Sequence, residues 1–118
     1  MPQAGELRDR ISFERRGLID GEALGDWEVA FTRSAKLLPL RGGEAVLADR
    51  LQGKQPYIIT VRRDAGTRQI TTDWRAFDAR NTERAFNIKS VAPAVDPRTK
   101  RQDLGWLDLL VEEGRADG

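Results

Sequence analysis

The sequence contains no cysteine and no histidine among its 118 residues. Without cysteine the chain can form neither a disulfide framework nor a thiolate metal site. Without histidine it lacks the commonest general base and the commonest metal ligand, and Ser–His or Cys–His nucleophilic triads cannot form. We therefore expect no catalytic residue, no metal site and no cofactor.

A charge excess is also missing, because 20 Lys plus Arg residues face 19 Asp plus Glu residues, for a net charge of +1. A dedicated nucleic-acid-binding protein should carry a clear basic excess. Long apolar runs are absent too: no segment approaches the roughly 18 residues of a membrane span, and the first ten residues have no signal-peptide core. The default expectation is a soluble cytoplasmic product with a single domain over residues 4–114 and a frayed tail at 115–118.

What the sequence does contain is apolar–polar alternation with a period of two, which is typical of half-buried β-strands. It predicts strands at residues 10–16, 27–40, 57–63, 68–77, 85–91 and 104–113. Glycines and aspartates at 17–26 predict a long mobile loop, the polar stretch 78–84 reads as a turn, and prolines and charges at 92–103 predict an exposed loop. About six strands with regular turn signals favour a small antiparallel barrel or sandwich.

Two local features qualify this pattern. Arg33 interrupts the apolar face of the second strand, where we expect a bulge or a sharp bend, because a lone arginine in a small core is costly. Residues 44–51 read as a short helix of about two turns, with Gly53 as its C-terminal stop. The preceding Gly42-Gly43 pair lacks the Lys-Ser/Thr of a phosphate loop, and Glu44 would repel a phosphate, so we interpret it as a tight turn.

The last strand is apolar on both faces. Leu107, Leu109 and Val111 share one face, and Leu104, Trp106 and Leu110 share the other. A strand at a protein surface should not show this pattern. The second face is covered either by the chain's own helix or by another subunit.

Basic residues gather in two places, Arg62, Arg63 and Arg68 around one turn, and Arg98, Lys100 and Arg101 in the last long loop. They are either ordinary solvated charge or weak contacts to DNA phosphates that add up over many copies. No aromatic residue that could stack on bases interleaves with either group, so sequence-specific readout is not expected.

The order of several short motifs resembles the phage head–tail joining family, the head-closure or stopper proteins of long-tailed phages and gene transfer agents. The opening Gly5, Leu7, Arg8, Arg10 and Ile11 are similar to the family's Gly-x-Leu-Arg-x-Arg-Ile segment. Ala35, Leu40, Gly43, Glu44 and Ala48 fit its middle pattern, and residues 86–91 resemble its Tyr/Phe-Asn-Ile-x-Ser-Val segment. The family often has a glycine near the turn before that segment, where this chain has none.

The resemblance implies a mainly β protein: a small barrel, SH3-like or similar, with one short α-helix and long loops, assembled as a six- or twelve-fold homo-oligomeric ring in the virion. The ring would lie between a portal or adaptor protein and a tail terminator or tail tube protein, close the DNA-filled head, and dock the tail. No catalysis and no membrane contact are expected.

Residue roles follow as hypotheses. Candidate subunit-interface residues are Val46, Arg50, Leu104, Trp106 and Leu110. Candidate residues near the DNA channel are Arg41, Lys54, Arg62, Arg63, Arg68, Arg98, Lys100 and Arg101. The loops 17–26 and 92–103 are long enough to reach a neighbour, and residues 41–43 with 53–56 are the first candidate for a segment that closes the channel.

Three alternatives remain open. The chain could be the tail terminator or the portal-side adaptor of the same machine, although adaptors tend to be rich in helix. It could be a monomeric SH3-like or OB-like module that binds a peptide or an oligonucleotide, with salt-sensitive affinity for DNA. An enzyme that uses only carboxylates and arginines would need a constellation that the sequence does not display.

Overall fold

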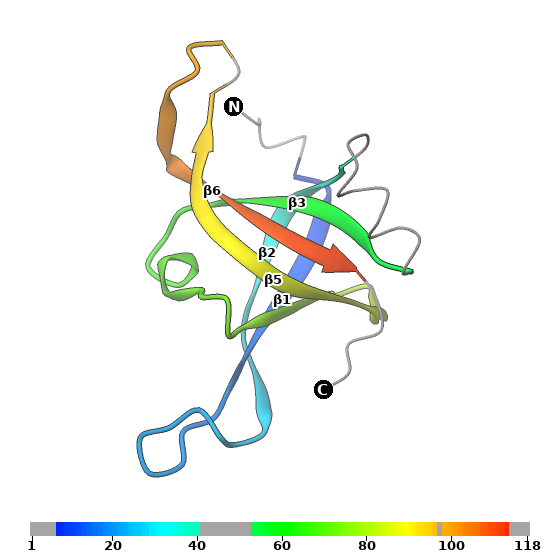
Figure 1. Ribbon diagram of the computed structural model, residues 1–118, viewed down its shortest axis with the longest axis vertical. Helices are drawn as coiled ribbons and strands as arrows, with labels where there is room; N and C mark the ends of the chain where they lie inside the picture. The colour runs from blue at the N-terminus through cyan, green and yellow to red at the C-terminus, as the bar shows by residue number, and fades with distance from the viewer. Residues whose placement is uncertain (1–6, 41–52, 97, 114–118) are drawn as a thin grey trace.

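Six antiparallel strands close into a barrel in the order β1-β2-β3-β6-β5-β4 (Figure 1). The structure is a computed structural model and describes residues 7–40, 53–96 and 98–113. The strands are β1 (Asp9–Arg16), β2 (Trp27–Pro39), β3 (Gln55–Arg62), β4 (Arg75–Asp78), β5 (Asn81–Val95) and β6 (Gln102–Glu113). The predicted small antiparallel barrel of about six strands is confirmed. The predicted helix at 44–51 lies outside the described residues.

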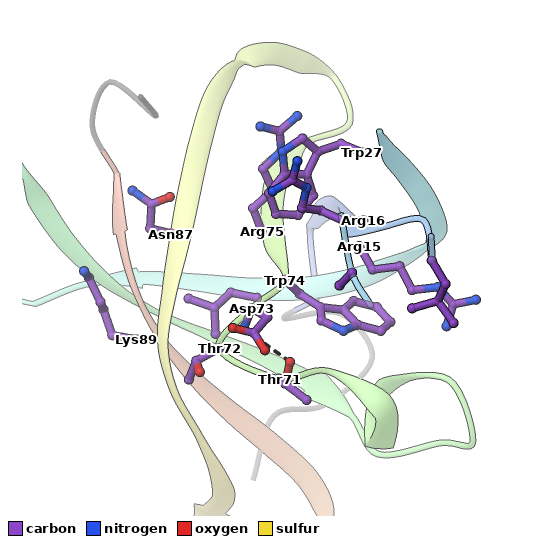
Figure 2. Close-up of a pocket in the computed structure, with 13 residues that line it drawn as sticks. Arg15, Arg16, Trp27, Thr71, Thr72, Asp73, Trp74, Arg75, Asn87 and Lys89 are labelled. Carbon is purple, nitrogen blue, oxygen red and sulfur yellow. Dashed lines mark hydrogen bonds between the residues drawn. The ribbon is translucent and has the colours of Figure 1, made fainter. Parts of the chain in front are cut away.

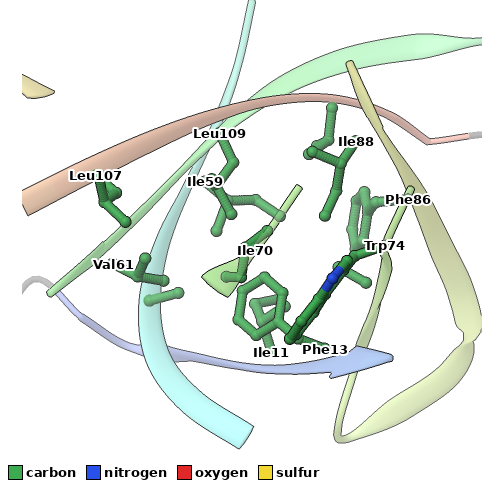
Figure 3. Close-up of a cluster of buried hydrophobic side chains, with 13 residues drawn as sticks. Ile11, Phe13, Ile59, Val61, Ile70, Trp74, Phe86, Ile88, Leu107 and Leu109 are labelled. Atoms are coloured by element: carbon green, nitrogen blue, oxygen red, sulfur yellow. The ribbon is translucent and has the colours of Figure 1, made fainter. Parts of the chain in front are cut away.

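The predicted alternation places one face of each strand inside the barrel (Figure 3). The core is lined by side chains that are almost fully buried: Ile11, Phe13, Ile59, Val61, Phe86, Ile88, Leu107, Leu109 and Val111. Burying one such side chain contributes about 1.5–3 kcal/mol relative to leaving it in water. The two-faced β6 fits this arrangement, since one of its apolar faces fills the core and the other points outward.

The strand predicted at 68–77 is wrong. Residues Thr67–Gln69 form a 3-10 turn, η2, and the segment pairs as a strand only from Arg75 onward, in β4. Ile70 and Trp74 are buried as the alternation suggested, but Thr72 is exposed and the chain between them turns. The segment therefore inserts two apolar side chains into the core without joining the sheet over its full length.

Polar contacts around Asp64 hold this turn. One carboxylate oxygen of Asp64 accepts the backbone N–H groups of Gly66 and Thr67, each at 2.8 Å. The buried Thr67 hydroxyl donates to the Arg62 carbonyl at 2.9 Å. Such side-chain bonds to the backbone compete with strand pairing, which explains why the alternating pattern misled the prediction.

Arg33 does not cause a bulge. The register between β1 and β2 skips Ala30, so the bulge lies three residues earlier. The Arg33 guanidinium has two partners at the edge of the core. Its Nε donates to Asp64 at 2.9 Å, and the group stacks 4.5 Å from the Phe31 ring centroid. An inward-facing arginine is tolerated here because its charge is paired and partly exposed.

The long mobile loop predicted at 17–26 is a compact extension of the β1–β2 hairpin. Ile19 and Glu22 exchange two backbone hydrogen bonds, of 2.8 and 3.0 Å, across Asp20-Gly21. Both turn residues have positive φ, 53° and 80°, as a type I′ turn requires. The hairpin projects from one end of the barrel (Figure 1).

The exposed loop predicted at 92–103 is also mostly strand. β5 continues to Val95 and β6 begins at Gln102, so that only a short loop joins them, closed by a hydrogen bond of 2.9 Å from the Asp96 N–H to the Arg101 carbonyl. This hairpin projects from the end opposite the first one (Figure 1). The turn predicted at 78–84 is likewise shorter than expected, because β5 begins at Asn81.

Candidate assembly surfaces

The first projecting hairpin, residues 17–28, is here called the acidic arm. Three of its apolar side chains are exposed, Leu18 at 74%, Ile19 at 51% and Leu24 at 56%. Its charged residues are Asp20, Glu22, Asp26 and Glu28, and it contains no lysine or arginine. Exposed apolar residues beside charge of one sign are typical of a contact surface for another macromolecule.

A groove of about 720 Å³ lies at the base of the acidic arm (Figure 2). Its walls come from the β1–β2 hairpin, the turn at residues 71–74 with the start of β4, and the middle of β5. Four cations and one carboxylate line it: Arg15, Arg16, Arg75, Lys89 and Asp73. The pairing of β1 with β4, which opposes Glu14 to Arg75, brings these distant segments together.

Guanidinium groups in this groove pack on two tryptophan rings. Trp27 lies between Arg75, 4.3 Å from its ring centroid, and Arg16, at 5.9 Å. Arg15 lies 5.6 Å from the Trp74 ring. Cation–π contacts of this kind contribute about 0.5–1 kcal/mol each at exposed sites. They help to fix the side chains, together with hydrogen bonds from Arg16 Nε to the Gly25 carbonyl at 3.0 Å and from Arg15 Nη1 to Gln69 Oε1 at 3.4 Å.

The charges of the groove are only partly neutralised. Arg75 donates from Nε to Glu14 at 2.9 Å, and Lys89 Nζ lies 3.9 Å from Glu112. In the parts of the chain that the structure describes, no carboxylate lies within salt-bridge distance of Arg15 or Arg16. Chemically, the groove is suited to an extended anionic segment.

The second projecting hairpin, residues 94–106 together with Arg62 and Arg63 beside it, is here called the basic arm. The pairing of β3 with β6 places Arg62 opposite Trp106, and the guanidinium stacks 5.0 Å from that ring. The Arg63 N–H donates to the Gly105 carbonyl at 2.9 Å. The fold thus brings together seven sequence-predicted site residues: Arg62, Arg63, Arg98, Lys100, Arg101, Leu104 and Trp106.

Other predicted site residues lie elsewhere. Lys54 precedes the opposite end of β3, 3.9 Å from Glu112. Arg68 belongs to η2, and Leu110 lies on the outer wall of the barrel opposite Ile58. Arg41, Val46 and Arg50 are outside the described residues, as is the whole of the proposed channel-closing stretch 41–43. Its other part, 53–56, leads into the start of β3.

An ion-pair network joins the start of β5 to the end of β6. Arg84 donates to both carboxylate oxygens of Glu113, at 2.6 and 3.1 Å, and its charge packs on the Tyr57 and Phe86 rings. The hydrogen bond from Arg84 lowers the pKa of Glu113, and burial with the Glu113 charge raises the pKa of Tyr57. At the turn after β3, the hydrogen bond from Arg33 likewise lowers the pKa of Asp64.

Sequence reasoning missed the acidic arm's structure and the groove. Asp20-Gly21 flanked by Leu18-Ile19 was a usable signal, because Asp-Gly between apolar residues is a strong hairpin indicator. The groove had no local signal, since it depends on the pairing of β1 with β4. Within the described ranges, no cluster of carboxylates has the arrangement of a metal site, and no helix has the length and apolar character to cross a bilayer.

A family model described as the phage head completion protein matches residues 2–114. The chain belongs to this family. The match confirms the resemblance drawn from the opening, middle and late motifs. The phage head completion family consists of structural phage proteins, so this chain is a structural head-completion component of the virion.

A solved structure extends the comparison of the fold. This chain is similar to the solution structure of protein SF1141 from Shigella flexneri 2a, with 23% sequence identity and a TM-score of 0.57. The match covers 98% of this chain and 99% of SF1141. At this identity the likeness shows a shared fold. No protein with a curated description matches the chain.

Proposed function

We propose that this head completion protein forms a homo-oligomeric ring at the opening of the DNA-filled head, closes that opening, and presents the docking surface for the tail. The observation that carries the proposal is the pair of arms that project from opposite ends of one closed barrel (Figure 1). A closed barrel has no free sheet edge for strand addition. Association at the closed barrel wall therefore uses side chains, and the arms, which extend beyond the closed part of the sheet, add exposed apolar side chains that suit that purpose.

We propose one partner for each axial face of the ring. The head-side face contacts the portal or adaptor protein, and the other face contacts the tail terminator or tail tube protein. The basic residues make non-specific contact with double-stranded DNA in the channel. The near-zero net charge of +1 is compatible with a channel through which DNA must move during delivery. Any role of residues 41–43 and 53–56 in closing that channel is part of the same proposal.

Electron microscopy of particles produced without this protein tests the proposal. We expect heads that have packaged and then lost their DNA, or full heads without tails, and restoration of complete particles when the wild-type chain is supplied in trans. Particles with normal DNA content and normal tails in the absence of the chain would contradict it.

The groove favours a second candidate, a monomeric module that binds an anionic chain. Its half-buried Trp27, together with Arg15 and Arg16, which have no carboxylate partner among the described residues, resembles the combination of stacking and charge used for single-stranded nucleic acids. This candidate predicts a monomer with salt-sensitive affinity for oligonucleotides, weakened several-fold by Arg15→Gln. Equal binding by wild type and variant at low salt would remove it.

A further inference from the structure

We propose that the acidic arm of one copy binds the basic arm of the next copy, so that one repeated arm-to-arm contact builds the oligomer. This inference rests on the proposed ring. The partner of each arm is the opposite arm of another copy of this chain.

The charges of the two arms are complementary. The acidic arm carries four carboxylates and no basic residue. The basic arm carries five Lys or Arg residues against Asp96 and Asp103, for a net charge of +3. Both aspartates of the basic arm are engaged locally, because each accepts a backbone N–H from two residues further along the chain, at 2.8 and 3.0 Å. The cations therefore dominate the surface that an approaching partner meets.

Each arm also offers apolar side chains beside its charges. Leu18, Ile19 and Leu24 are more than half exposed on the acidic arm, and Val95 and Leu104 are exposed at 52% and 60% on the basic arm. Trp106 adds a ring that Arg62 covers on one face. Interfaces combine an apolar centre with a charged rim, and charge complementarity selects the partner and the register.

The positions of the arms make the contact intermolecular. They project from opposite ends of the longest dimension of the molecule, which is 46 Å (Figure 1). The two arms of one copy therefore cannot meet each other. A contact between two different patches is heterologous, and its repetition produces a closed ring or an open filament. DNA cannot be the common partner of both arms, because the carboxylates of the acidic arm would repel its phosphates.

Exchanging the charges tests the contact. Variant A carries Glu22→Lys, Asp26→Lys and Glu28→Lys on the acidic arm, which changes the net charge of that arm from −4 to +2. Variant B carries Arg98→Glu and Arg101→Glu on the basic arm, which changes its net charge from +3 to −1. All five side chains are exposed and none forms an ion pair in the described structure. Each variant alone presents two arms of like charge, whereas a mixture allows A to alternate with B.

The readout is the yield of DNA-filled, tailed particles when the variants are supplied in trans to cells that lack the wild-type gene. We expect A and B alone to lower the yield at least tenfold, and A with B together to restore most of it. Glu83→Lys, a charge reversal on β5 outside both arms, should behave as wild type. Restoration by A alone and by B alone, at wild-type levels, would overturn the arm contact while leaving the head-completion role intact. Failure of wild type to restore particles would contradict the proposed function instead.

A second measurement decides the contact without particles. The chain has no cysteine, so Ala23→Cys on the acidic arm and Thr99→Cys on the basic arm introduce unique thiols. In an equimolar mixture at high concentration, we expect mild oxidation to give mainly mixed A23C–T99C dimers, several-fold above either homodimer, and fewer of them at high salt. Statistical mixing of the three dimers would overturn the proposal. The thiol of the Thr99→Cys variant can also be labelled with a maleimide. Protection of this thiol by added DNA, without mixed dimers, would assign the basic arm to DNA and also overturn the proposal.

Discussion

Glu113→Gln should destabilise the barrel measurably, because it removes the carboxylate charge to which Arg84 is hydrogen-bonded. Arg84 and Glu113 connect the start of β5 to the end of β6 through two hydrogen bonds of 2.6 and 3.1 Å. Their side chains are 33% and 24% exposed, so solvent screens the pair only partly. Glutamine keeps the size and one acceptor oxygen but loses the charge-assisted bidentate pairing.

The expected loss is about 1–2 kcal/mol, the range for a partly buried, charge-assisted hydrogen-bonded pair. For 118 residues, an unfolding entropy of about 2.1 cal/mol/K per residue gives roughly 0.25 kcal/mol/K. The melting temperature should therefore fall by about 4–8 °C. Glu112→Gln is the matched control, because the two lysines near Glu112 lie 3.9 Å away and are nearly half exposed. It should cost less than about 0.5 kcal/mol.

Differential scanning calorimetry from pH 7 down to pH 3 is the assay. The pKa of Glu113 is lowered in the folded state, mainly by the hydrogen bond from Arg84. Its contribution is therefore fully present above the ordinary glutamate pKa of about 4.3 and is lost as the pH falls through the lower folded value. The gap between wild type and Glu113→Gln should close at the acid end. An equal effect of Glu113→Gln and Glu112→Gln, or a gap independent of pH, would refute the reasoning.

Three further outcomes follow from the fold. Ile70→Ala should cost about 2–5 kcal/mol in urea unfolding because its side chain is buried in the core, whereas Thr72→Ala should stay within about 0.5 kcal/mol; equal costs would mean that the segment is a regular strand. Asp64→Asn should lower the melting temperature at pH 7 and lose this effect in acid, since the pKa of Asp64 is lowered by its arginine partner; a shift that persists at low pH would contradict this. Gly25→Ala places a methyl group 2.8 Å from the carbonyl oxygen across the acidic arm, so amide exchange should accelerate in that arm and not in the barrel core; unchanged protection of the arm would contradict the close approach.

Much of the barrel could be predicted because alternation is a local signal. The apolar positions of β1, β3 and β6 point inward as their period of two requires. The prediction from alternation failed where local hydrogen bonds determined the backbone conformation. Ile70 and Trp74 alternate correctly, but the bonds that Asp64 and Thr67 make turned the chain out of the sheet. Prolines and charges at 92–103 suggested a loop, although Pro93 lies in strand pairing next to a register shift.

The candidate surfaces were less predictable because they are made by pairings between distant strands. Arg62 meets Trp106 only because β3 pairs with β6, and Trp27 meets Arg75 only because β1 pairs with β4. The basic residues could be named from the sequence, but their division into the basic arm, η2 and the far end of β3 could not. The opposite charges of the two hairpins are visible in the sequence once the hairpins are known, and the Asp20-Gly21 turn was the signal that would have revealed the first.

Cryo-electron microscopy of the assembled particle tests the central claim most directly. The account predicts a ring of this chain at the opening of the head, with the acidic arm of each copy seated on the basic arm of its neighbour. A single copy at that position, or a ring whose subunits meet through the barrel walls while both arms remain free, would contradict it.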